Sequence, residues 1–259
     1  MKGFLNTTSC LWQRGKHAFS ELFFPRLCPV CNKPFPDHTG ALCLSCLHHL
    51  PRTNHIHAPD NPLARLFEGM LLIHPMLRFE RASSYFFYVP HTPYANLILD
   101  FKFHSQRHLA AELARTMIRE YGSQNSFFDG LDYLVPIPIH PKRAMMRGYN
   151  QSHYIAKGIH DMLDVPIIEK GLHCIRHTRP QANTPRAQRY ENMDNVFRWD
   201  ADLVARLAGK RILLIDDVIT TGSTISACAR ALLQTVDALP VESRLPIRLS
   251  ILSLAYANR

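Results

Sequence analysis

The chain has 259 residues, of which 46% are hydrophobic and 20% are charged. This globular composition excludes a wholly disordered chain, and no run approaches the roughly 18 unbroken apolar residues of a membrane-spanning helix. Thirty lysines and arginines against 21 aspartates and glutamates give a net charge of +9, which favours anionic partners such as phosphates or nucleic acid.

The first 25 residues predict an amphipathic helix that ends at Pro25. Polar residues such as Arg14 and Lys16 interrupt its apolar positions, so the segment does not fit a signal peptide. We therefore expect a cytoplasmic protein. The helix either packs on its own domain or lies on a membrane surface, and its thin cationic face disfavours the second alternative.

Four cysteines, Cys28, Cys31, Cys43 and Cys46, form two Cys-x-x-Cys pairs that are separated by eleven residues. Two such pairs can place four thiolates tetrahedrally around Zn²⁺. Residues 26–52 contain little else that could form a core, so we expect a module whose folding depends on structural zinc. A redox site is the weaker alternative, because a thioredoxin-like site uses one such pair inside a βαβ unit. The other three cysteines have no partner pattern and are interpreted as incidental.

A polar, proline-containing stretch begins the segment 53–77, which predicts a linker to a larger domain over residues 78–259. Strand-like and helix-like segments alternate in that domain, which predicts an α/β fold with a parallel sheet. In chain order we expect strand 81–89, helices 93–103 and 107–121, strand 131–137, helix 150–163, a short strand 166–168, strand 211–215, helix 223–238 and strand 247–254.

The clearest chemical motif is ILLIDDVITTGST, residues 212–224. Its apolar start predicts a strand buried on both faces, which delivers Asp216 and Asp217 to the edge of the sheet where α/β proteins bind ligands. The loop that follows contains Thr220, Thr221, Gly222, Ser223 and Thr224. This loop opens a helix, and the free N–H groups of a helix N-terminus attract phosphate. The two carboxylates suit sugar hydroxyls or Mg²⁺. The motif therefore predicts a phosphorylated sugar as ligand, whereas an ordinary strand–turn–helix would not explain two adjacent acids.

The motif resembles the phosphoribosyl diphosphate (PRPP) binding motif of type I phosphoribosyltransferases. That resemblance implies that Asp216 and Asp217 hold the ribose hydroxyls and that residues 220–224 cradle the 5′-phosphate, with Mg²⁺ bound to PRPP. Together with the cysteine pairs, the segment CLSCLHHLP at 43–51 and the segment VPIPIHPKRAMMRGYNQS at 135–152, it resembles the competence protein F (ComF) family.

The family resemblance implies a type I phosphoribosyltransferase fold, with a parallel sheet flanked by helices and a small N-terminal zinc module held by four cysteines. It also implies a protein linked to natural competence and DNA uptake, with PRPP, single-stranded DNA and DNA-processing proteins as candidate partners. Two hypotheses follow. The first is a phosphoribosyltransferase, although no catalytic residue stands out. The second is a non-catalytic factor that keeps the fold and binds single-stranded DNA.

Two basic segments are further candidates. By the resemblance, the loop that includes residues 136–143 would hold pyrophosphate, with Lys142, Arg143 and Arg147 supplying charge; the alternative is a solvated helix start. Lys102 is a further candidate of this kind, and Lys102 and His104 are also candidates for the acceptor side. The loop 171–190 has no acidic residue and either tracks a nucleic-acid backbone, closes over the active site, or is merely solvated. Its candidate contacts to nucleic acid are Arg176, Arg179, Arg186 and Arg189.

Overall fold

The computed structural model describes residues 25–35, 40–71, 74–103, 106–122, 125–175 and 195–257. The amphipathic helix expected near the N-terminus lies outside the described residues, as do His104 and most of the basic loop 171–190 with its four arginines. No helix in the described part of the chain is both long enough and apolar enough to cross a bilayer.

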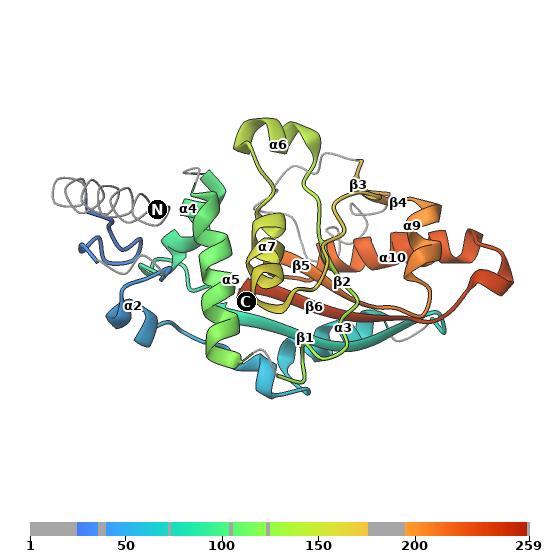
Figure 1. Cartoon of the computed structure of the whole chain (residues 1–259), viewed down its shortest axis with the longest axis horizontal. Coiled ribbons are helices and arrows are strands. Elements are labelled where there is room, and N and C mark those ends of the chain that lie inside the picture. The colour runs from blue at the N-terminus through green and yellow to red at the C-terminus, as the bar shows by residue number, and fades with distance from the viewer. Residues whose placement is uncertain are drawn as a thin grey trace, which may run out of the picture.

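A four-stranded parallel sheet forms the centre of the molecule, with the strand order β1-β6-β5-β2 (Figure 1). These strands are β1 (Leu77–Phe87), β2 (Tyr133–Pro136), β5 (Arg211–Ile219) and β6 (Ile247–Tyr256). A separate antiparallel pair consists of β3 (Leu172–Cys174) and β4 (Phe197–Trp199). The parallel sheet expected from the alternating pattern is thus confirmed. The short strand expected at 166–168 is reduced to a single bridge between Ile167 and Leu134.

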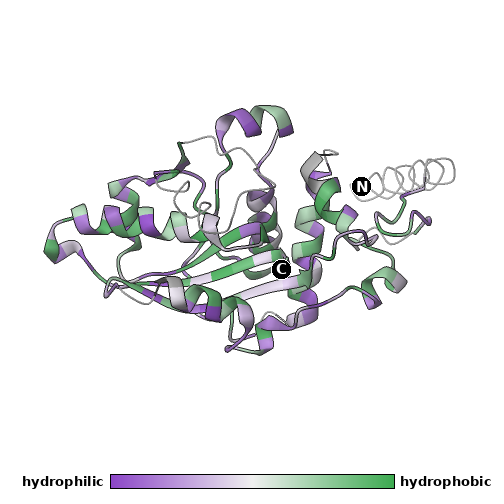
Figure 2. Cartoon of the chain, turned by 180° about the vertical axis from the view of Figure 1, so that it is seen from behind, coloured by the Kyte–Doolittle hydropathy of each residue, from purple (hydrophilic) through white to green (hydrophobic). Residues whose placement is uncertain are grey.

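Helices cover both faces of the sheet. The α-helices are α2 (Leu44–His48), α3 (Pro62–Leu71), α4 (Ala95–Phe103), α5 (Arg107–Tyr121), α6 (Pro141–Arg147), α7 (Gln151–Leu163), α9 (Ala201–Leu207) and α10 (Ser223–Ala238). Short 3₁₀ turns occur at His55–His57 and Val241–Ser243. Helices α4, α5 and α7 pack with the cysteine-rich segment in one apolar cluster, and α3, α9 and α10 pack in a second. Figure 2 shows apolar residues concentrated in the central strands between these layers.

Strand β5 explains why both faces need helices. Its residues alternate between the two clusters: Leu213 and Ile215 belong to the first, and Ile212 and Leu214 belong to the second. All four side chains are fully buried. A strand that is apolar on both sides is typical of a parallel sheet covered on both faces. The continuous apolar run therefore places β5 in the interior of the sheet, and its acidic residues lie at the carboxyl end of the strand.

The segment 53–77, expected to be a linker, contains a helix that packs on the core. Helix α3 buries Leu63, Ala64 and Phe67 against β1 and α10. Asn61 precedes this helix, and its side-chain Oδ1 accepts hydrogen bonds from the backbone N–H groups of Leu63 and Ala64 at 3.0 Å, which caps the helix start. The polar, proline-containing start of the segment hid a short helix whose apolar residues recur every three to four positions.

Candidate functional site

The acidic pair lies at the carboxyl end of β5, as the sequence predicts. Asp216 and Asp217 are both half-buried. Asp216 Oδ1 accepts a hydrogen bond from the backbone N–H of Asp217 at 2.9 Å and faces the Ser152 hydroxyl at 3.5 Å. Ser152 belongs to the first turn of α7, so this contact joins the end of β5 to the start of a second helix. The carboxylates are therefore held in place while still lining a cavity.

The loop after β5 turns directly into the N-terminus of α10. Gly222 adopts a left-handed conformation with φ of 74° immediately before α10. The Thr221 hydroxyl donates to Ser223 Oγ at 3.0 Å, and the Ser226 hydroxyl donates back to the Gly222 carbonyl at 3.0 Å. Thr220, Gly222, Ser223 and Thr224 line a small hollow together with Asp216. Because α10 has 16 residues, its aligned peptide dipoles add to the attraction of an anion here.

A cavity of about 220 Å³ connects these groups with the segment that follows β2. Five parts of the chain contribute its walls. They are the loop Ile137–His140, Arg143 and Arg147 of α6, Gln151 and Ser152 of α7, Cys174, Val196 and Phe197 near the β3–β4 pair, and Asp216, Asp217, Val218 and Thr224. In Figure 1, α6 projects from the rest of the molecule at the top of the view, above α7.

Cations and carboxylates thus line the same cavity. Arg143 and Arg147 are four residues apart on α6, so they share one face of the helix. Burial lowers the pKa of Arg147, whereas the negative charge of Asp217 raises it, and the nearby charge of Arg143 lowers it further. An arginine remains protonated under such shifts. The arrangement can bind a ligand that carries an anionic group at one end and sugar hydroxyls at the other.

Local capping explains how α6 and α7 present these side chains. Helix α6 starts with Pro141, and His140 Nδ1 accepts a hydrogen bond from the backbone N–H of Lys142 at 3.2 Å. Asn150 caps α7 by accepting from the Ser152 N–H at 3.2 Å, and its Nδ2 donates to the Ile137 carbonyl at 2.9 Å. Asn150 therefore fastens the loop after β2 to the start of α7.

The two lysines proposed with these arginines differ in position. Lys142 is exposed and is not among the residues that line the cavity. Lys102 belongs to the last turn of α4, and its side chain lies outside what the structure describes. The structure adds cavity residues to which the sequence assigned no role in a site, namely Gln151, Ser152, Val196 and Phe197. These four residues are uncharged, so the three-dimensional arrangement is what identifies them as cavity residues.

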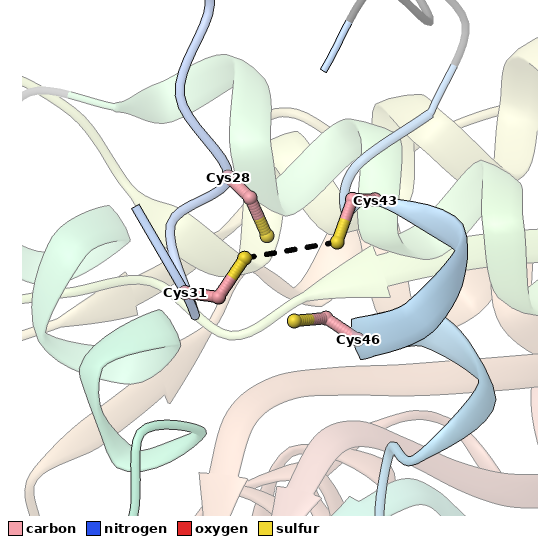
Figure 3. A group of neighbouring side chains, drawn as sticks. All are labelled: Cys28, Cys31, Cys43 and Cys46. Atoms are coloured by element: carbon pink, nitrogen blue, oxygen red, sulfur yellow. Dashed lines mark hydrogen bonds between the residues drawn. The ribbon is translucent and has the colours of Figure 1, made fainter. Parts of the chain in front are cut away.

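The four N-terminal cysteines converge, as their spacing predicts (Figure 3). Their sulfur atoms all lie within 4.8 Å of one another, and the Sγ atoms of Cys31 and Cys43 are 3.8 Å apart. Cys28 and Cys46 are buried and the other two are half-buried. A set of four thiols at these separations fits a tetrahedral Zn²⁺ ion and leaves no open position for substrate. Cys174 and Cys228 lie elsewhere in the described chain.

The environments of the thiols differ within the cluster. Burial raises the pKa of the Cys28 thiol, but backbone N–H groups from Cys43, Cys31 and Val30 outweigh this effect and lower the pKa to about 7. A thiolate is the form that binds zinc. Burial instead raises the pKa of Cys46 well above its usual range. A cation at the centre of the cluster would stabilise all four thiolates, so these residues fit a structural zinc site.

Comparison with known proteins agrees with this architecture. Residues 150–248 match the phosphoribosyl transferase domain family. The chain is 29% identical over 143 residues to competence protein F of Haemophilus influenzae, which covers 54% of this chain and 62% of that protein. It is 27% identical to the DNA utilization protein YhgH of Escherichia coli K12, in a match that covers 82% of this chain and 93% of that protein. It is also 27% identical to competence protein ComFC of Bacillus subtilis, in a match that covers 86% of this chain and 78% of that protein.

The parallel sheet, its two helical layers and the matched domain define an α/β protein of the type I phosphoribosyltransferase fold with a small cysteine module. Within that class, the chain is similar to proteins named competence protein F, competence protein ComFC and DNA utilization protein YhgH. The fold expected from the sequence and the resemblance to competence protein F are therefore both confirmed.

Proposed function

We propose that this chain binds Mg²⁺–PRPP in the cavity between the β5–α10 loop and helices α6 and α7, and that it serves in DNA uptake or DNA utilisation. The observation that carries the proposal is that Asp216 and Asp217 share one cavity with Arg143 and Arg147. PRPP has a 5′-phosphate, ribose hydroxyls and a pyrophosphate. The loop 220–224, the two carboxylates and the two arginines offer matching groups for these three parts.

Phosphoribosyl transfer is the reaction that such a complex would support. The bond between ribose C1 and the pyrophosphate oxygen breaks, and the pyrophosphate leaves with the electron pair. A nitrogen of the acceptor forms the new bond to C1 and releases a proton. Arg143 and Arg147 would stabilise the charge that develops on the leaving group. Bound Mg²⁺ would neutralise part of the pyrophosphate charge, and Asp216 and Asp217 are the carboxylates in this cavity that suit its preference for oxygen ligands.

Calorimetric titration of Mg²⁺–PRPP into zinc-loaded protein tests the proposal. We expect micromolar binding by the wild type. Asp216→Asn/Asp217→Asn should lose at least about tenfold in affinity, because the side chains that accept hydrogen bonds from the ribose hydroxyls lose their negative charge. Asp202→Asn is the matched control, since it removes an exposed carboxylate from α9. No binding by the wild type, or equal binding by the double variant, would contradict the proposal.

Binding of single-stranded DNA is the second candidate function. The net charge of +9 favours it, and the relatives carry the names competence protein and DNA utilization protein. Arg176, Arg179, Arg186 and Arg189 are the proposed contacts, on a loop outside the described residues. Fluorescence anisotropy with a labelled oligothymidylate should show affinity that falls steeply with salt. Arg176→Ala/Arg179→Ala should weaken this binding and leave the affinity for PRPP unchanged; equal loss of both ligands would contradict two separate sites.

A further inference from the structure

Gln151 has an unusual position in the cavity. It is the first residue of α7, it lines the cavity beside Arg147, and only 1% of its surface is exposed. Its side-chain Oε1 accepts a hydrogen bond from Arg147 Nη1 at 3.4 Å. Its Nε2 is buried and has no hydrogen-bond partner within the described residues. A buried donor without a partner is uncommon in folded proteins, because water satisfied that group before folding.

The orientation of the amide follows from its neighbour. A guanidinium group has donors only, so the atom of Gln151 that faces Arg147 must be the carbonyl oxygen. The NH₂ group is then directed away from Arg147. Gln151 Nε2 is thus a buried side-chain donor of this wall for which the described residues offer no acceptor.

The surrounding charges indicate which part of a ligand this donor would meet. Gln151 lies beside the cationic side chain of Arg147, whereas the neighbouring Ser152 faces the carboxylate of Asp216. An NH₂ group next to an arginine suits an anionic oxygen, and the carboxylates suit hydroxyl groups. The positive end of the α7 dipole acts in the same direction, since α7 has 13 residues and starts at Gln151.

We infer that Gln151 Nε2 donates a hydrogen bond to the pyrophosphate group of bound PRPP, while Gln151 Oε1 holds the Arg147 guanidinium beside the same group. The inference rests on the proposed function and adds a neutral, specificity-determining residue to it. Gln151 would distinguish PRPP from ribose 5-phosphate, because only PRPP carries the group that satisfies this donor.

The test compares the affinities of these two ligands by calorimetry in the presence of Mg²⁺. Gln151→Met keeps the length of the side chain and removes both polar atoms. Gln151→Glu keeps its shape and the contact to Arg147 but replaces the donor by a charged acceptor. Gln234→Glu, at an exposed position of α10, is the matched control for the change of charge.

We expect Gln151→Met to weaken PRPP binding by about 10- to 100-fold, as for loss of a hydrogen bond to a charged group, and Gln151→Glu to weaken it more. Affinity for ribose 5-phosphate should change less than about twofold in both variants, and the control should bind both ligands normally. PRPP binding that survives both substitutions overturns the inference and leaves the proposed function intact. The inference is also overturned if the Gln151 variants lose affinity for PRPP and for ribose 5-phosphate equally while their melting temperature stays unchanged. A wild type that binds neither ligand rejects the proposed function and the inference together.

Discussion

Gly222, in the loop between β5 and α10, packs against the ring of Phe67 from α3. A Cβ atom at position 222 would lie 3.0 Å from Phe67 Cε1, which is closer than ordinary van der Waals contact. Gly222 also has a φ of 74°, a conformation that favours glycine. Helix α3 therefore packs against the β5–α10 loop, although it lies about 150 residues away in the sequence.

Replacement of this glycine should affect both stability and binding. We expect Gly222→Ala to lower the free energy of unfolding by about 1–3 kcal/mol, because it adds strain in the left-handed region and a contact with Phe67. Affinity for ribose 5-phosphate should fall as the loop shifts. Gly69→Ala is the control: Gly69 lies in helix α3, and a Cβ atom there would have no neighbour within 4 Å, so the change should stabilise by about 0.5–1 kcal/mol. Urea unfolding and calorimetry measure the two effects, and an unaltered affinity in Gly222→Ala would argue against a role for the loop.

The contribution of α3 to the core can be measured at Phe67. This side chain is fully buried, so Phe67→Ala should cost about 3–5 kcal/mol in the free energy of unfolding. The neighbouring Glu68 is exposed, and Glu68→Ala should change stability by less than about 0.5 kcal/mol. If chemical denaturation showed that Phe67→Ala lowers the free energy of unfolding no more than Glu68→Ala does, α3 would not contribute to the core in this way.

The cysteine cluster should carry one zinc ion per chain, measurable by elemental analysis. Cys43→Ser should abolish zinc binding and destabilise the protein, because the module's Phe35, Leu42 and Leu50 belong to the same apolar cluster as helix α5. Cys174→Ser is the control, since Cys174 lies outside the cluster and should leave the zinc content unchanged. Purified wild type without zinc, and with a melting temperature insensitive to chelator, would contradict a structural metal.

Stability should also fall in mild acid because of His55. Its ring is buried between Phe87 and Tyr256, and burial lowers its pKa below the ordinary value of 6.5. The unfolded chain therefore binds a proton more readily than the folded chain as the pH falls below about 6.5, and each such proton favours unfolding. This loss continues until the pH reaches the lowered pKa of the folded state.

Urea unfolding at pH 7.5 and pH 5.5 measures this effect. We expect His55→Phe to show a smaller loss of stability between the two pH values than the wild type, because an apolar ring takes up no proton. His57→Phe, which replaces an exposed histidine two residues away, should keep the wild-type dependence. An identical pH dependence in wild type and His55→Phe would rule out this explanation.

The elements with strong local patterns could be predicted from the sequence. The helices expected at 107–121 and 223–238 coincide with α5 and α10, and the run 211–215 falls within β5. Periodicity and clear end signals determine these elements: α5 ends before Gly122, and α10 ends two residues before Pro240. Helix α3 was missed because Asn61 and Pro62 resemble loop residues, although they cap and start a helix here.

Some residues of the candidate site could likewise be predicted from the sequence, and others could not. Asp216 and Asp217 are recognisable because they follow a buried strand, whereas Arg143 and Arg147 are candidates through the family resemblance. Gln151 was not recognisable as a cavity residue, because a glutamine at a helix start is ordinary until its burial and its missing partner are known. Phe197 reaches the cavity only through the pairing of β3 with β4. Contacts between residues distant in sequence decide such positions, and no local pattern reports them.

The most direct test of the proposed ligand site is a crystal structure of the zinc-loaded protein with Mg²⁺–PRPP. We predict the 5′-phosphate in the loop 220–224, the ribose hydroxyls at Asp216 and Asp217, and the pyrophosphate beside Arg147. Ligand density in the opposite orientation, with pyrophosphate on the β5–α10 loop, or at a site away from this cavity, would contradict the proposed site.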